Sequence, residues 1–184
     1  MAMFGRLFRR DSEADAIASA LYGAIVAQAR NPALYTDFAV ADTVTGRFEM
    51  VTMHVILVLD RLEPQGEAVR PLGQRIFDLY VLDMDRSLRE LGIGDLGVPK
   101  RMKKMAQAFF GRHEAYRQAL AAGDVARLTE TIARNVYPAG DAGAAAGLAA
   151  YVLASRAAPL DPAAGTVAFA DLAAYAGARA ETAA

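Results

Sequence analysis

Residues 45–63, which read TGRFEMVTMHVILVLDRLE, decide the fold of this chain. Apolar side chains recur along them at alternating spacings of three and four residues, which is the period of a helix with a buried stripe. The stripe consists of Phe48, Val51, Val55, Val58 and Leu62. A strand over residues 55–59 is the alternative, but the helical period extends well beyond it. We therefore predict a central helix that Pro64 ends, with Arg47, His54 and Arg61 along one narrow polar edge.

Outward from this helix, capping signals and amphipathic spacing predict further helices on both sides. They span about residues 12–30, 71–91, 99–120 and 124–135, with one turn of helix near residues 34–38. The inward stripe of the 71–91 helix consists of Phe77, Val81, Met84, Leu88 and Leu91. The glycine-rich stretch 92–97 is predicted to be a turn, and Pro99 starts the next helix, which Gly111 is expected to kink or divide.

The helical patterns along the chain, together with its length, predict an all-α, single-domain bundle of about six to eight helices. The chain has 184 residues, of which 54% are hydrophobic and 22% charged, so global disorder is excluded. We expect three parts along the chain. Residues 1–11 form a basic flexible arm, residues 12–138 a helical core, and residues 139–184 an alanine-rich extension of two modest helices packed on that core.

The composition and motifs give no support to catalysis. The chain has no cysteine, which excludes disulfides, thiol catalysis and cysteine-ligated metals. Its two histidines, His54 and His113, are far apart, and His54 is expected to be a satisfied core or edge residue. Residues 92–100 lack the spacing of a phosphate-binding loop, and no hydrolase or metalloprotease motif is present. We predict no enzymatic activity, no metal and no other cofactor.

The chain is expected to be a soluble, cytoplasmic protein. Residues 142–154 are too short and too weakly apolar for a membrane span, and the first ten residues lack the apolar region of a secretory signal. Basic and apolar residues alternate in that first stretch: Phe4, Arg6, Leu7, Phe8, Arg9 and Arg10. Such an arm either dips into a membrane interface, binds a partner or is a disordered start.

A run of positive charge without an acid covers residues 99–112. Its cations are Lys100, Arg101, Lys103, Lys104 and Arg112. Helical spacing puts the three lysines on one face, with Met102, Met105 and Phe109 turned to the other. The run is either a solvated face or an anion-facing patch for ribosomal RNA, phospholipid or an acidic protein segment.

A second set of charges precedes the turn and mixes both signs. It consists of Asp83, Asp85, Arg86, Arg89, Glu90 and Asp95. Asp85 with Arg89, and Arg86 with Glu90, have the spacing of helical ion pairs. A cation within one turn keeps a carboxylate ionised, which disfavours a catalytic acid. Structural salt bridging is the preferred interpretation, and a binding role is the second.

With these charges in view, the chain resembles the ubiquinol–cytochrome c chaperone family, in its α-proteobacterial type. The resemblance covers about residues 14–137 and is carried by several short pieces together with His54. The pieces are LY at 21–22, IVAQAR at 25–30, DT at 42–43, GRFE at 46–49, FD at 77–78, DMDRSLRE at 83–90, GIGD at 92–95, VPK at 98–100, KM at 104–105, FFGR at 109–112 and RN at 134–135. The tail matches only loosely.

The resemblance implies a non-enzymatic chaperone that binds newly made cytochrome b and promotes assembly of the bc1 complex, respiratory complex III. Relatives in mitochondria work with a smaller partner assembly factor and associate with the ribosome near the tunnel exit. The absence of a presequence fits a bacterial protein peripheral to the cytoplasmic face of the inner membrane. The alternative is a ribosome- or anionic-lipid-binding helical module without a cytochrome b client. The expected partner-binding residues are Lys100, Arg101, Lys103, Lys104, Arg112, Asp83, Asp85, Arg86, Arg89 and Glu90.

Overall fold

Helix α3 (Val44–Leu62) is the axis of the fold, as the sequence predicts. In the computed structural model, which describes residues 2–137 and 142–176, α3 contacts helices on several sides, and fourteen of its nineteen residues are buried. The hydroxyl of Thr43 caps its first turn by accepting from the Gly46 N–H at 3.1 Å. A Cβ on Gly46 would lie 1.9 Å from the Ala41 carbonyl oxygen, so the entry into α3 requires glycine.

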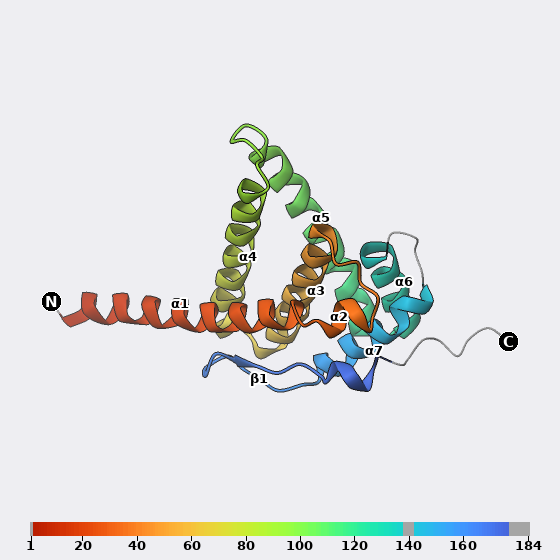
Figure 1. Cartoon of the computed structure of the whole chain (residues 1–184). Coiled ribbons are helices and arrows are strands. Elements are labelled where there is room, and N and C mark those ends of the chain that lie inside the picture. Colours follow the sequence, from red (N-terminus) through yellow and green to blue (C-terminus); the bar gives the residue numbers. More distant parts are fainter. Residues whose placement is uncertain (1, 138–141, 177–184) are drawn as a thin grey trace.

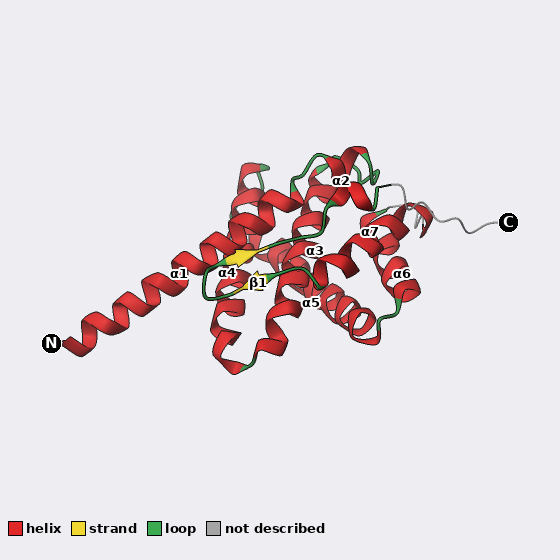
Figure 2. Cartoon of the chain, turned by 90° about the horizontal axis from the view of Figure 1, so that it is seen from below, coloured by secondary structure: helices red, strands yellow, loops and turns green. Residues whose placement is uncertain are grey.

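Six further α-helices surround α3 in the described part of the chain, and the all-α prediction is confirmed (Figures 1 and 2). They are α1 (Ala2–Ala29), α2 (Ala33–Thr36), α4 (Arg70–Glu90), α5 (Val98–Ala122), α6 (Val125–Val136) and α7 (Ala142–Arg156). Short 3-10 turns, Glu63–Gln65 and Glu67–Val69, connect α3 to α4. Helix α1 begins at Ala2, whereas the sequence predicted Ser12, because no proline interrupts the preceding turns.

Helices α4 and α5 diverge from a common apex and lie on either side of α3 (Figure 1). Gly92 has a φ of 78° in the connecting turn, which any other residue type would adopt only with strain. Helix α5 is continuous through Gly111, contrary to the expected kink. An internal glycine costs only about 1 kcal/mol relative to alanine, and the buried Phe109 and Tyr116 hold the helix on both sides of it.

The inward face of α4 is rotated from the predicted stripe. The residues it buries are Ile76, Tyr80, Met84 and Leu88. Phe77 is half-buried and packs against Phe109 of α5, with ring centroids 4.9 Å apart, while Leu91 is 54% exposed. The difference arises because α4 packs on α1, α3 and α5, and a single apolar stripe does not describe three neighbours.

The described part of the C-terminal segment, residues 142–176, contains one α-helix, not the two that were expected. Helix α7 packs on α6 and α3. The chain then forms a two-residue antiparallel ladder, β1 (Leu160–Asp161) with β2 (Thr166–Val167), and a 3-10 turn (Leu172–Ala174). Pro159 and Pro162 prevent a helix here, since proline lacks the N–H that a helix needs. The core runs from α1 through α3 to α7.

None of the helices within residues 2–137 and 142–176 combines the length and apolar character needed to cross a bilayer.

Candidate functional site

An apolar groove lies between the first turns of α3 and the C-terminal half of α4. Its volume is about 500 Å³, and the first turns of α5 close one end. The apolar lining consists of Val44, Phe48, Val51, Met84, Leu88, Leu91 and Met105. Val44 is 61% exposed and Leu91 54% exposed, so the groove offers apolar surface that the chain itself leaves uncovered.

Methionine side chains form an adaptable wall of this groove. Met84 and Met105 line it on one side and also line a second hollow of about 260 Å³ between α4 and α5. Met102 and the rings of Phe77 and Tyr80 line that second hollow. Methionine is unbranched and flexible, so this wall can adjust to the shape of an apolar partner. A groove of this kind suits an apolar polypeptide segment better than a polar small molecule.

Charged side chains form the rim of the groove. They are Arg30, Arg47, Asp83, Glu90 and Arg101. Two of them already have partners: Arg47 is 2.6 Å from Asp42, and Asp83 accepts a hydrogen bond from the Tyr22 hydroxyl at 2.8 Å. Within the described ranges, no ion pair engages Arg30, Glu90 or Arg101. These three charges remain available to a partner lying in the groove.

The predicted basic residues divide into two groups. Lys100, Arg101, Lys103 and Lys104, here called the basic cluster, are all exposed on the first turns of α5. Arg112 lies apart from them and contacts Glu49 of α3 through two hydrogen bonds of 2.6 and 2.9 Å. Burial raises the pKa of the Glu49 carboxyl, and the charge of Arg112 only partly offsets this rise. Arg112 therefore joins α5 to α3.

The mixed-charge set on α4 is only partly paired as predicted. Arg89 donates to Asp85 at 2.6 Å and also bonds to Asp95 in the turn, and both contacts raise the pKa of its guanidinium. Arg86 and Glu90 are exposed, and no ion pair between them occurs in the part of the chain that the structure describes. Asp83 faces Tyr22 of α1. Burial, and then the hydrogen bond to Asp83, raise the pKa of the Tyr22 hydroxyl well above its usual range.

His54 is a satisfied core residue, as expected. It is fully buried, with Nδ1 2.8 Å from the Met50 carbonyl oxygen and Nε2 2.8 Å from the Tyr151 hydroxyl. Burial lowers the pKa of the imidazole to about 4, so the ring is neutral at pH 7. A neutral ring whose Nδ1–H donates to Met50 accepts at Nε2 from the Tyr151 O–H. Both ring nitrogens are therefore occupied by the fold.

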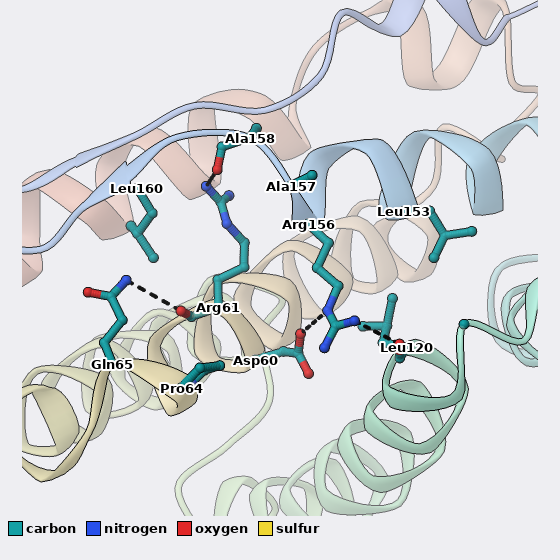
Figure 3. Close-up of a pocket in the computed structure, with 11 residues that line it drawn as sticks. Asp60, Arg61, Pro64, Gln65, Leu120, Leu153, Arg156, Ala157, Ala158 and Leu160 are labelled. Carbon is teal, nitrogen blue, oxygen red and sulfur yellow. Dashed lines mark hydrogen bonds and ion pairs between the residues drawn. The ribbon is translucent and has the colours of Figure 1, made fainter.

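A separate cavity, of about 590 Å³, lies away from the groove, where α3, α5 and α7 end (Figure 3). Arg156 donates to Asp60 at 2.8 Å and to the Leu120 carbonyl at 2.7 Å. Arg61 donates to the carbonyls of Ala158, Pro159 and Ala168 at 2.6 to 3.0 Å. Arg156 thus bonds to a carbonyl in the last turn of α5, which offsets the negative end of that helix dipole. Arg61 joins α3 to the segment that follows α7. The charged residues that line this cavity, Asp60, Arg61 and Arg156, are therefore engaged in contacts that hold the fold together.

Hydrogen bonds within the fold satisfy the buried polar side chains of the described residues. Among them, no buried side-chain nitrogen or oxygen lacks a hydrogen-bond partner, and no three His, Asp or Glu residues are grouped to hold a metal ion. The sequence leaves open whether a groove lies between α3 and α4, because Val44 and Arg30 belong to different segments and no local pattern joins them. The available signal in the sequence was Leu91, which continues the apolar stripe of α4. It was interpreted as an inward residue, but it is exposed and lines the groove.

Comparison with known proteins connects this geometry to a family. A model of the family described as ubiquinol-cytochrome C chaperone matches residues 36–181. The crystal structure of the Cbp3 homolog from Brucella abortus is similar to this chain, with a TM-score of 0.82 and 43% sequence identity. The match covers 94% of this chain and 98% of that one. No curated protein was found to match the chain.

Proposed function

The chain belongs to the ubiquinol–cytochrome c chaperone family, and we propose that it is a non-enzymatic chaperone that binds newly made cytochrome b. In this role it promotes assembly of the bc1 complex. It works at the cytoplasmic face of the inner membrane, where the client is made, and a second assembly factor is a further candidate partner.

The observation that carries this proposal is the groove between α3 and α4. Its lining is apolar, its methionine wall is adjustable, and its rim holds the unpaired charges of Arg30, Glu90 and Arg101. An apolar helix of a membrane protein that has not yet met its partners needs such a surface, since its side chains are otherwise exposed to water. We assign the groove to a helical segment of cytochrome b.

The residues expected to bind partners take different positions in this proposal. Asp83, Glu90 and Arg101 lie on the rim of the groove and would contact the client directly. Lys100, Lys103, Lys104 and Arg86 are exposed beside it, while Arg89 and Asp85 are paired with each other. Arg112 contributes through the position of α5, because its guanidinium is paired with Glu49.

Val44 provides a sharp test, because it is the first residue of α3 and lines the groove. The change Val44→Asp puts a carboxylate in the apolar groove, and an acid in the first turn agrees with the helix dipole, so folding is preserved. Val125→Asp is the matched control, since Val125 is the first residue of α6 and is 51% exposed away from the groove. Co-purification of detergent-solubilised cytochrome b should fall about tenfold or more for Val44→Asp and stay unchanged for Val125→Asp.

Two outcomes would contradict the proposal. One is equal recovery of cytochrome b by both valine variants, which would remove the groove from client binding. The other is normal bc1 assembly in a strain without this protein.

The second candidate is a ribosome- or lipid-binding module without a dedicated client, and the exposed basic cluster favours it. Reversal of Lys100, Lys103 and Lys104 to glutamate separates the two candidates. Loss of cytochrome b co-purification would tie the cluster to the client. Loss of salt-sensitive sedimentation with ribosomes or anionic liposomes, with the client still bound, would assign it to a docking role.

A further inference from the structure

The apex between α4 and α5 presents an apolar residue to solvent. Leu96 is 98% exposed in the turn, whereas the other exposed large apolar residues range from 51% to 61% among the described positions. Backbone hydrogen bonds order the turn. Ile93 N–H donates to the Leu88 carbonyl at 3.2 Å, and Gly97 N–H donates to the Gly94 carbonyl at 2.8 Å. The Arg89–Asp95 contact adds a further tie. Leu96 is thus held outward on an ordered turn.

Positive charge is concentrated around this leucine. Residues 85–104 contain six Lys and Arg against three Asp and Glu, a net charge of +3, whereas the whole chain has a net charge of −1. The remaining residues therefore have a net charge of −4, so the apex is positive while the rest of the chain, taken together, is negative. Asp85 and Asp95 are both bonded to Arg89, so they do not compensate the basic cluster.

The basic cluster also occupies a place that the helix itself does not favour. Lys100 is the third residue of α5, and Lys103 and Lys104 follow in its next turn. The N-terminal end of a helix carries a partial positive charge, so cations there cost stability. Within residues 2–137 and 142–176, no carboxylate forms an ion pair with any of the four cations of the cluster. These charges are offset only when an external anion approaches.

From these observations we propose that the apex docks on the surface of an anionic lipid bilayer. Leu96 enters the interface between headgroups and acyl chains, and the basic cluster contacts the lipid phosphates around it. A fully exposed leucine beside a group of exposed cations matches a bilayer, which offers an apolar layer beneath its anionic surface. Ribosomal RNA would engage the charges and leave Leu96 in water.

Docking at the apex would also bring the groove to the membrane. Glu90, Leu91 and Arg101 line the groove and belong to the apex region, so the groove opens beside the docked surface. This consequence rests on the proposed function, since it makes the groove a receiver for an apolar helix leaving or entering the bilayer. The lipid contact itself does not require a client.

Sedimentation with vesicles tests the docking directly. The full chain should bind vesicles of phosphatidylcholine with about 40% phosphatidylglycerol, and binding should fall steeply as salt rises. It should bind pure phosphatidylcholine vesicles at least tenfold more weakly. The triple variant Lys100→Glu, Lys103→Glu, Lys104→Glu should lose the preference for anionic lipid. The charge-matched control is Arg70→Glu, Arg127→Glu, Arg134→Glu, three exposed arginines outside the apex, and it should keep that preference.

Leu96 supplies the test that separates a bilayer from other polyanions. Leu96→Asn should weaken vesicle binding about tenfold without changing its salt dependence, and Leu82→Asn, at a 56% exposed leucine outside the turn, should not. Equal binding by these two variants, or sedimentation with ribosomes but not with anionic vesicles, would overturn the proposal. Cytochrome b binding in detergent separates membrane docking from the proposed chaperone function. Leu96→Asn should still bind cytochrome b, while Val44→Asp should lose cytochrome b and still bind vesicles.

Discussion

The two ends of α3 use charged residues in opposite ways. At its C-terminal end Asp60 and Arg61 are buried, and their partners are Arg156 and the carbonyls of the C-terminal segment. At its N-terminal end Arg47 is paired with Asp42, but across the groove the cations of the basic cluster on α5 are exposed and without acidic partners among the described residues. Residues of the same type therefore join segments at one end and remain available to partners at the other. Position relative to the core, not residue type, decides the role.

Glu49 and Arg112 allow the largest test of this comparison, because a paired buried charge should be costly to break. Arg112→Ala leaves the Glu49 carboxylate buried without its partner and should lower the free energy of unfolding by about 3 kcal/mol. Urea denaturation measures this loss. Arg101→Ala, which removes an exposed cation of the same helix, should change stability by less than about 0.5 kcal/mol.

The cause of the Arg112 effect can be separated from lost packing. The double variant Glu49→Gln, Arg112→Ala removes the charge that would otherwise be stranded, so it should be more stable than Arg112→Ala alone. If the double variant is the less stable of the two, the pair does not act through charge burial.

His54 gives the buried polar network a dependence on pH. Its pKa is about 4 in the folded protein, against the ordinary 6.5 in the unfolded chain. Above pH 6.5 the ring is neutral in both states and adds no pH dependence. As the pH falls from about 6.5 to about 4, the unfolded chain binds a proton that the folded protein does not, so stability falls by on the order of 3 kcal/mol.

Denaturation at a series of pH values isolates this contribution. Carboxylates also titrate in acid, so the informative quantity is the difference between the pH slopes of the natural chain and of a variant without His54. His54→Gln should lose the part of the slope that belongs to the buried ring. An unchanged slope in His54→Gln would show that the network around Tyr151 does not hold the ring neutral.

Sequence reasoning succeeded where one period dominated and failed where several neighbours shared a helix. The uninterrupted apolar spacing of residues 45–63 has a single solution, a buried helix, and α3 is that helix. Helix α4 packs on three partners, so its inward face could not be derived from one stripe, and Leu91 was misplaced. Arg112 and Glu49 are 63 residues apart, and only the fold brings them together. For the same reason the sequence leaves the existence of the groove between α3 and α4 open, and only the fold decides it.

The basic cluster gives the smallest expected change in stability and the clearest contrast with Arg112. In the triple variant Lys100→Glu, Lys103→Glu, Lys104→Glu, acids replace cations near the positive end of the α5 dipole. The free energy of unfolding should therefore stay within about 1 kcal/mol of the natural chain, with a slight increase expected. Thermal denaturation measures the change, with the three-arginine control variant at its side. A rise in stability together with lost vesicle binding would mean that the cluster lowers folding stability in order to meet an anionic surface. A fall of several kcal/mol would instead show that these lysines stabilise the fold as Arg112 does, and the contrast between the two ends of α3 would fail.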